Sequence, residues 1–193
     1  MKYQLSISKD EINELPLYVF NGTIKLIEST GDALVAVEQL KQEKVLGFDT
    51  ETRAAFKKGE RYDVSMLQLA TNSCAYLFRL NKFKLMPELV AILADPNIVK
   101  AGVAVRDDIK GLQKLLAFEA TNFVELADVA QEKKIKNFGL RALTGILLKK
   151  RLSKRAKISN WELTTLTPAQ ISYAACDAVV GVEIYQAFTD SNI

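Results

Sequence analysis

The sequence predicts an α/β domain in which helices cover a mixed sheet. Three strand-like segments follow one another early in the chain, and helices then alternate with strands up to its end. Successive strands can pair antiparallel, whereas strands separated by helices usually pair parallel. With 193 residues, of which 49% are apolar and 25% charged, the chain has the length and composition of one globular domain.

Apolar periodicity and helix start signals define the expected elements. Residues 1–22 are expected to form an irregular N-terminal extension, interrupted by Pro16, and residues 23–193 to form the domain. The expected strands are Thr23–Glu28, Val45–Thr50, Val64–Ala70, Ala75–Leu80, Ile98–Val105 and Phe123–Leu126. The expected helices are Asp32–Glu43, Lys84–Ala94, Asp107–Ala117, Gly139–Leu148 and a last one that ends at about Phe188.

The last helix has the clearest start. Thr167 supplies a capping hydroxyl, Pro168 stands at the first helical position, and Gln170 stands at the third. The segment Ile98–Val105 is apolar almost throughout, as expected of a strand in the middle of a sheet. These two segments therefore indicate most clearly a helix and a central strand of the predicted fold.

The chain has no histidine. This excludes Ser-His-Asp and Cys-His triads, histidine-bound zinc and the commonest acid–base group near neutral pH. Cys74 and Cys176 match no zinc or disulfide spacing, so reduced thiols in a cytoplasmic protein are expected. No apolar run nears the roughly 20 residues needed to cross a bilayer, and no secretory signal is visible. The net charge of +3 does not by itself indicate a nucleic-acid binder.

Two carboxylates stand at the end of the strand that begins at Val45. Asp49 and Glu51 are two positions apart, so on a strand they point to the same face. Two carboxylates about 4 Å apart repel by roughly 4 kcal/mol at an effective dielectric near 20, and a divalent cation would relieve this repulsion. On spacing alone, a strand-end aspartate beside a solvated glutamate is the commoner explanation.

Two further segments place acids beside the predicted sheet. Tyr173 and Asp177 lie one helical turn apart among small apolar residues, where an aspartate is expected to have a partner. Asp107 and Asp108 stand in the first turn of a helix, where acids also suit the helix dipole. Each segment is a weak signal alone. Together, in a chain without histidine, they predict a carboxylate–metal site.

The order and spacing of these residues resemble the three motifs of the DEDD exonuclease superfamily, in its tyrosine-containing branch. The matching residues are Asp49-x-Glu51, Gly102-Val103 with Asp108, and Tyr173-x-x-x-Asp177. The similarity extends from Val45 to Phe188 and is closest to Werner-syndrome-type 3′–5′ exonuclease domains, with ribonuclease D more distant. Other similar segments are Glu51-Thr52-Arg53, Phe56-Lys57-Lys58-Gly59, Leu67-Gln68-Leu69, Asn122–Leu126 and Ser159-Asn160-Trp161. The resemblance implies a ribonuclease H-like fold.

The second motif departs from the family pattern. Lys110 stands where Werner-type domains tend to carry an aromatic residue. Asp107 beside Asp108 also leaves the alignment ambiguous by one residue, and adjacent helical residues point about 100° apart. The family's distance from Gly102 selects Asp108, with Asp107 as the alternative.

The resemblance implies a site for two divalent cations, Mg²⁺ or Mn²⁺, that hydrolyses phosphodiester bonds. Asp49 would bridge both ions, and Asp108 would support the second of them. Glu51 and Asp177 would complete the site of the ion that carries the attacking water. Tyr173, with an ordinary pKa near 10, is a poor base and would orient that water instead.

Further residues are expected to bind the substrate. Those implied to lie against the 3′ nucleotide are Thr50, Leu67, Gln68, Gly102 and Val103, although sheet packing explains Leu67 and Val103 equally well. Positions 149–157 hold six basic residues and no acid. Phosphate contacts are expected from Lys150, Arg151, Lys154 and Arg155, with a solvated loop as the alternative. Trp161 is expected to anchor this loop or to stack on a base.

The partner is therefore expected to be a nucleic-acid 3′ end, and not a membrane. The Werner-type similarity favours DNA, although no sequence feature indicates whether a 2′-hydroxyl, which separates RNA from DNA, is recognised. One alternative is an exoribonuclease that trims RNA, as ribonuclease D does. Another is a catalytically silent nucleic-acid-binding module of the same fold, which the presence of all four acids and the tyrosine argues against. The sequence predicts neither strandedness nor oligomeric state.

Overall fold

The computed structural model describes residues 3–153, 156 and 158–190. Its centre is a six-stranded sheet with the order β1-β4-β3-β2-β5-β6. The strands are β1 (Thr23–Ile27), β2 (Val45–Thr52), β3 (Val64–Ala70), β4 (Cys74–Phe78), β5 (Val99–Gly102) and β6 (Phe123–Glu125). Strand β3 runs antiparallel to β2 and β4, while the other neighbouring pairs are parallel. The prediction of a mixed α/β sheet flanked by helices is confirmed.

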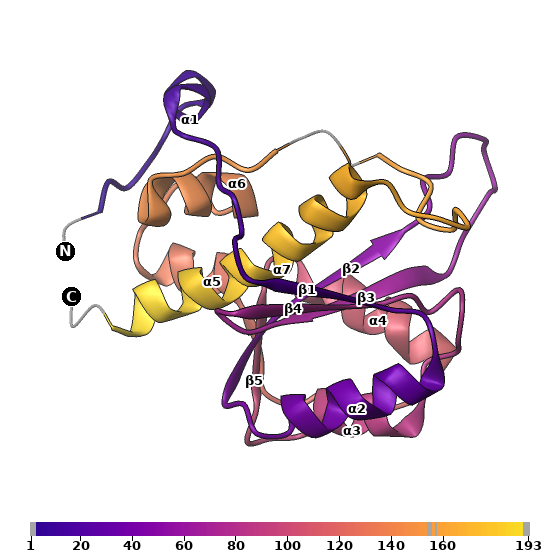
Figure 1. Ribbon diagram of the computed structural model, residues 1–193. Coiled ribbons are helices and arrows are strands. Elements are labelled where there is room, and N and C mark those ends of the chain that lie inside the picture. Colours follow the sequence, from indigo (N-terminus) through magenta and orange to yellow (C-terminus); the bar gives the residue numbers. More distant parts are fainter. Residues whose placement is uncertain (1–2, 154–155, 157, 191–193) are drawn as a thin grey trace.

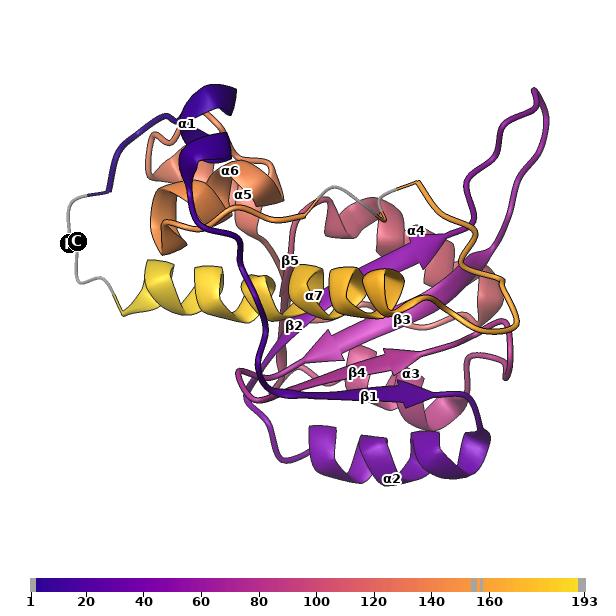
Figure 2. The same ribbon diagram turned by 45° about the horizontal axis from the view of Figure 1, so that its top comes forward.

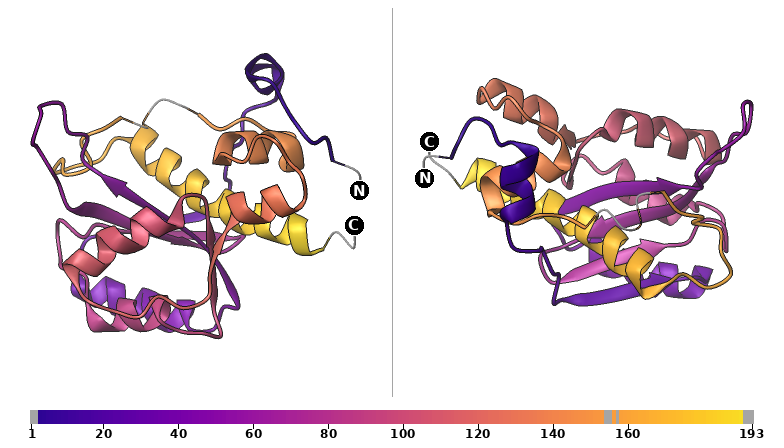
Figure 3. Two further views of the ribbon diagram at one scale, coloured as in Figure 1. Left: turned by 180° about the vertical axis from the view of Figure 1, so that it is seen from behind. Right: turned by 90° about the horizontal axis from the view of Figure 1, so that it is seen from above.

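Helices cover both faces of the sheet (Figures 1 and 2). They are α1 (Lys9–Glu14), α2 (Thr30–Leu40), α3 (Pro87–Leu93), α4 (Val105–Leu115), α5 (Leu126–Glu132), α6 (Leu140–Leu143), the π-helical turn η1 (Thr144–Leu148) and α7 (Pro168–Thr189). Buried residues of α2, α3 and α4 share one core cluster with the sheet. Helix α7 crosses the opposite face, and Figure 3 shows α1, α5 and α6 gathered near its C-terminal end.

Helix α7 lies directly on the central strands. Thr167 and Gln170 form the expected capping box at its start. A Cβ added at Gly47 of β2 would lie 1.8 Å from the carbonyl oxygen of Ala178, and one added at Gly181 would lie 2.6 Å from that of Ala101. The helix can therefore approach β2 and β5 this closely only because these positions carry no side chain.

Residues 1–22 are not irregular throughout, contrary to the prediction. Ser8 caps α1, because its Oγ accepts from the Glu11 amide at 3.1 Å while the Glu11 carboxylate accepts from the Ser8 amide at 2.7 Å. Ile7 and Ile12 are buried in the cluster that includes residues of α5 and α7. The capping box Ser8-x-x-Glu11 was a readable signal for this helix.

Several boundaries also differ from the prediction. Strand β5 ends at Gly102 instead of Val105, because Ala104 adopts a left-handed conformation (φ 65°) that turns the chain into α4. The segment expected as one helix from Gly139 to Leu148 divides into α6 and η1. Helix α5 was not predicted.

Candidate active site

Three carboxylates converge where β2 passes beneath α7. One oxygen from each of Asp49, Glu51 and Asp177 can be chosen so that all three lie within 4.8 Å of one another. Asp49 and Glu51 are alternate residues of β2 and share the face that Gly47 turns toward α7. Asp177 comes from the middle of α7 and is 8% exposed. The spacing of two along the strand and the position in the helix thus bring these side chains together.

The surroundings of Asp49 disfavour its negative charge. Burial raises the pKa of this carboxyl well above its ordinary value, and the charges of Asp177, Asp108 and Glu51 raise it further. A hydrogen bond from the backbone at Thr50 acts in the opposite direction. A set of carboxylate oxygens that repel one another fits a hard divalent cation such as Mg²⁺ or Mn²⁺, because such ions prefer oxygen ligands.

The fourth predicted acid, Asp108, approaches from α4. The Thr50 Oγ1 hydroxyl donates to its Oδ1 at 2.5 Å. Burial raises the pKa of Asp108 to about 6, and the charges of Asp107 and Glu125 add to the effect. Asp108 is not one of the three mutually close carboxylates, although its charge acts on Asp49.

The neighbouring Asp107 points away from the cluster. Its side chain is 87% exposed and pairs with Lys110 at 3.1 Å. Of the two aspartates between which the sequence left a choice, the structure therefore brings Asp108 to the site. Lys110, which stands where related domains tend to have an aromatic residue, is used in this surface ion pair.

Glu125 holds the start of α4, a role that the sequence did not reveal. Its two carboxylate oxygens accept from the backbone amides of Ala104 at 3.0 Å and Val105 at 2.9 Å. The helix N-terminus, where the amides have no intrahelical acceptor, is thereby satisfied from β6. Asp108 stands in the first turn of this helix, so Glu125 helps to fix its position.

Tyr173 lies one turn before Asp177 on α7. Its hydroxyl is hydrogen-bonded to the Asp177 carboxylate, and burial, followed by the charge of Asp177, raises the pKa of the phenol far above its ordinary value. The phenol is therefore protonated at neutral pH. Its ring packs near the indole of Trp161, with 6.2 Å between ring centroids.

Similarity to known proteins decides the family. A family model described as 3′-5′ exonuclease matches residues 24–191. The chain belongs to the 3′-5′ exonuclease family. The resemblance predicted from the carboxylate motifs is thus confirmed, and the acids described above lie inside the matched range.

Two curated relatives illustrate the relationship. The mouse bifunctional 3′-5′ exonuclease/ATP-dependent helicase WRN is 35% identical over 193 residues, which is 95% of this chain and 14% of WRN. Exonuclease 3′-5′ domain-containing protein 2 of Drosophila melanogaster is 38% identical over 148 residues, covering 74% of this chain and 25% of that protein. This exonuclease domain therefore spans only a minor part of both relatives.

Solved structures share the fold. The EXO domain of Aedes aegypti Nibbler superposes with a TM-score of 0.80 at 24% identity, covering 90% of this chain and 91% of that one. Escherichia coli RNase D superposes with a TM-score of 0.79 at 18% identity, covering 87% and 44%. No described helix of this exonuclease domain is long and apolar enough to span a membrane.

Four of the described residues predicted to bind substrate are buried, and for Leu67 and Trp161 packing was already the alternative explanation. Leu67, Gln68 and Trp161 are each 0% exposed. In this structure they can act on a substrate only through the residues that they support, and Trp161 packs as an anchor instead of offering a face to a base. Gly102 is buried as well, and a Cβ there would lie 2.4 Å from the Phe48 carbonyl oxygen. Val103 is half-buried.

Gln68 is unusual among these residues. It pairs with Asp49 across β2 and β3, and neither its side-chain oxygen nor its side-chain nitrogen has a hydrogen-bond partner. Buried polar atoms without a partner are rare and unfavourable. The strand pairing places this amide next to the Asp49 carboxylate, whose pKa burial raises well above its ordinary value.

The basic segment at positions 149–157 is only partly described, and the predicted phosphate contacts of Lys154 and Arg155 lie outside the described residues. Lys150 is exposed. Arg151 is half-buried, and its Nε donates to the carbonyl oxygen of Leu15 at 2.9 Å. Its side chain therefore holds the N-terminal segment, a structural contact that the sequence did not predict.

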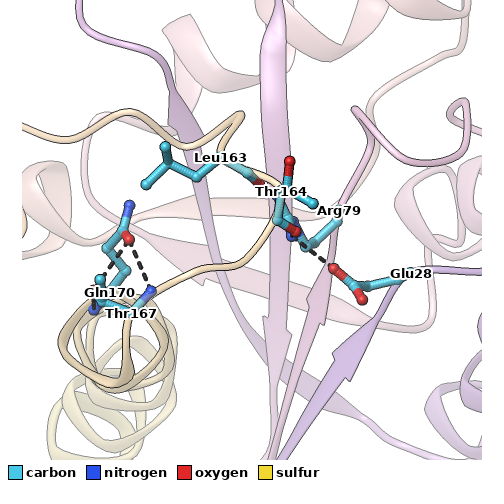
Figure 4. A network of polar contacts seen from close by, with 6 residues as sticks. All are labelled: Glu28, Arg79, Leu163, Thr164, Thr167 and Gln170. Atoms are coloured by element: carbon cyan, nitrogen blue, oxygen red, sulfur yellow. Dashed lines mark hydrogen bonds and ion pairs between the residues drawn. The ribbon is translucent and has the colours of Figure 1, made fainter.

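Arg79 anchors the chain that leads into α7 (Figure 4). Its side chain is 0% exposed, and Nη1 donates to Glu28 Oε1 at 2.6 Å and to the Thr164 carbonyl at 3.0 Å. Nη2 donates to the Leu163 carbonyl. The connection that carries Trp161 is thus fixed to the end of β4. A lone arginine at the end of an apolar strand was its only sequence signal.

Proposed function

We propose that this chain is a two-metal-ion 3′→5′ exonuclease that hydrolyses the terminal phosphodiester bond of nucleic acid and releases nucleoside monophosphates. Membership of the 3′-5′ exonuclease family supports the reaction and its direction. The observation that carries the proposal is the convergence of Asp49, Glu51 and Asp177, with the charge of Asp108 acting on Asp49.

The residues have separate roles in this proposal. When bound, two divalent cations, Mg²⁺ or Mn²⁺, would activate a water and neutralise charge on the phosphate. Asp49 would contact both cations, Glu51 and Asp177 one of them, and Asp108 the other. The Tyr173 phenol keeps its proton, which is donated to Asp177, so its oxygen would orient the attacking water by accepting from it instead of removing the water's proton.

We propose DNA as the preferred substrate. The support is the 35% identity to WRN over 95% of this chain, whereas the likeness to RNase D shows the fold alone. The nucleotide at the 3′ end would lie near Thr50, which stands between Asp49 and Glu51, and near Val103, which follows β5; both residues are half-buried. A cytoplasmic location remains a prediction from the sequence.

The test compares Asp49→Ala and Asp108→Ala with Asp107→Ala. Purified wild-type protein with Mg²⁺ or Mn²⁺ should shorten a 5′-labelled oligonucleotide stepwise from its 3′ end. The Asp49 and Asp108 variants should lose this activity while circular dichroism shows an intact fold. The Asp107 variant should keep it, because Asp107 faces solvent beside Lys110. Full activity in excess EDTA would rule out the metal mechanism.

Matched DNA and RNA oligonucleotides, single-stranded and recessed, separate the remaining alternatives. Faster loss of RNA would replace the DNA preference with a 3′-trimming exoribonuclease. Binding of both oligonucleotides without any shortening, under all metal conditions, would identify a catalytically silent nucleic-acid-binding module.

A further inference from the structure

The connection from β2 to β3, residues 53–63, stands away from the sheet on the side of α7 (Figures 1, 2 and 3). We call it the rim hairpin. The Glu60 carboxylate accepts from the amides of Phe56 and Lys57, each at 3.3 Å, and the Glu60 amide donates to the Lys57 carbonyl at 3.1 Å. Gly59 completes the turn with φ 93°. The tip is therefore shaped by its own hydrogen bonds.

This ordered tip holds an aromatic side chain in solvent. Phe56 is 82% exposed, more than any other large apolar side chain in the described part of the chain. Single exposed apolar residues are common, so exposure alone would mean little. Phe56, however, also lines a cavity of about 340 Å³ beside the turn.

The cavity lies between the rim hairpin and the connection that leads to α7. Its lining residues are Arg53, Ala54, Phe56, Lys57, Glu60, Tyr62, Ser159 and Asn160. The two walls are joined by the Ala54 amide, which donates to the Ser159 carbonyl at 3.4 Å, and by the Arg53–Glu162 ion pair at 3.1 Å. The Arg53 guanidinium lies 4.5 Å from the centre of the Tyr62 ring. A flat, partly polar ligand such as a nucleobase fits this lining.

The charges around the cavity favour an anionic partner. Lys57, Lys58 and Arg61 are exposed, and none of the three forms an ion pair with another described residue. The rim hairpin has two acids. Asp63 stands at its end, next to β3, and is not part of the cavity lining. Glu60 lines the cavity, but its carboxylate is turned into the hairpin. Phe56 follows Glu51 by five residues, so the cavity lies within about 18 Å of the carboxylates along the chain.

We infer that the rim hairpin, with Ser159 and Asn160, binds an unpaired base of single-stranded nucleic acid by stacking it on Phe56, while Lys57, Lys58 and Arg61 contact the adjoining phosphates. This inference rests on the proposed function for its setting and adds a second holding point for the substrate strand. Stacking is open to unpaired bases because their faces are free, and it tolerates any base. In a duplex those faces are covered.

The experiment compares Phe56→Ala with Phe56→Trp, and uses Val35→Ala as the control. Val35 is 62% exposed on α2, on the opposite face of the sheet, so its variant tests loss of any exposed apolar side chain. The probe is a 12-nucleotide single strand with phosphorothioate linkages and one 2-aminopurine, moved stepwise from the 3′ end. Binding is followed by anisotropy and stacking by quenching of the 2-aminopurine.

Phe56→Ala should weaken binding about 10-fold, within the range that removal of one base–aromatic stack produces. It should also abolish quenching at one position near the 3′ end. Phe56→Trp should restore both signals, and Val35→Ala should match the wild type. Unchanged affinity in Phe56→Ala overturns the inference, as does equal weakening for a blunt duplex. Equal weakening in Phe56→Ala and Phe56→Trp overturns it too.

Hydrolysis of the p-nitrophenyl ester of thymidine 5′-phosphate with Mn²⁺ separates this inference from the proposed function. Failure of the wild type to hydrolyse it, with oligonucleotide binding still dependent on Phe56, removes the exonuclease proposal and leaves the hairpin site. If the wild type hydrolyses the ester and Phe56→Ala binds the oligonucleotide as tightly as the wild type, only the inferred site on the rim hairpin is rejected.

Discussion

The contact between α7 and the central strands differs from the rim hairpin in how each holds its side chains. Where α7 meets β2 and β5, the backbones touch at Gly47 and Gly181. Asp49, Glu51 and Asp177 therefore project from closely packed segments that have little room to shift. In the rim hairpin, a few hydrogen bonds around Glu60 shape the tip, and Phe56 stands in solvent. Carboxylates that repel one another must be held in a fixed geometry, whereas a nucleic-acid strand of any sequence is bound better by adaptable contacts.

The largest expected effect comes from adding one methyl group inside the tight contact. Gly47→Ala places a Cβ 1.8 Å from the Ala178 carbonyl oxygen, so β2 and α7 must separate. Because both partners are backbone, no side chain can rotate away. We expect a loss of about 4 kcal/mol in the free energy of unfolding, measured by urea denaturation. Loss of the folded state at 25 °C would agree with this expectation.

Gly31→Ala is the matched control. Gly31 stands in α2, where an added Cβ meets only the Ser29 hydroxyl at 3.9 Å. Alanine has the higher helix propensity, so this variant should be equal to the wild type or more stable by up to about 1 kcal/mol. Similar destabilisation by both substitutions would show that the contact under α7 is looser than the structure indicates.

The same contrast explains what the sequence could predict. Asp49 and Glu51 obey the strand period of two, and Tyr173 and Asp177 obey the helical turn, so local geometry sufficed for each pair. The α/β class followed from the order of apolar segments for the same reason. These features depend on residues near one another in the chain.

Features that depend on distant contacts could not be read in this way. The packing of α4 decides which of Asp107 and Asp108 faces the site, and the sequence does not reveal that packing. Glu125, which fixes the start of α4, lies 20 residues from Val105. Trp161 was left between packing and stacking, and its complete burial depends on long-range contacts. Arg151 looked like part of a basic surface, but its Nε meets Leu15, 136 residues away.

A second prediction concerns the pH dependence of the metal-free protein. The pKa of Asp108 is raised from 3.8 to about 6 in the folded state. Between these values the folded state binds more protons than the unfolded chain, so stability falls as the pH rises from about 4 to about 6. This shift accounts for about 3 kcal/mol at most. Asp108→Asn should remove this part of the fall, which urea denaturation in EDTA at pH 4.5 and pH 7 can measure.

Asp49 changes stability in the same direction, because its pKa is raised as well. The free energy of unfolding of Asp108→Asn is therefore expected still to fall as the pH rises, but by less than that of the wild type. If the free energy of unfolding of Asp108→Asn falls as steeply with pH as that of the wild type, Asp108 is more solvated than its contact with Thr50 indicates.

The smallest expected effect belongs to the exposed surface. Lys150 is exposed, so Lys150→Gln should change the free energy of unfolding by less than about 0.5 kcal/mol. If Lys150 contacts a phosphate, the slope of log affinity against log salt should become shallower by roughly 0.7 to 1 for a single-stranded oligonucleotide. Lys41→Gln on the α2 side is the control, because Lys41 pairs with Glu38 in solvent at 2.5 Å, away from the acids. A slope that does not change would assign Lys150 to the solvated surface and leave the cations of the rim hairpin as the better candidates for phosphate binding.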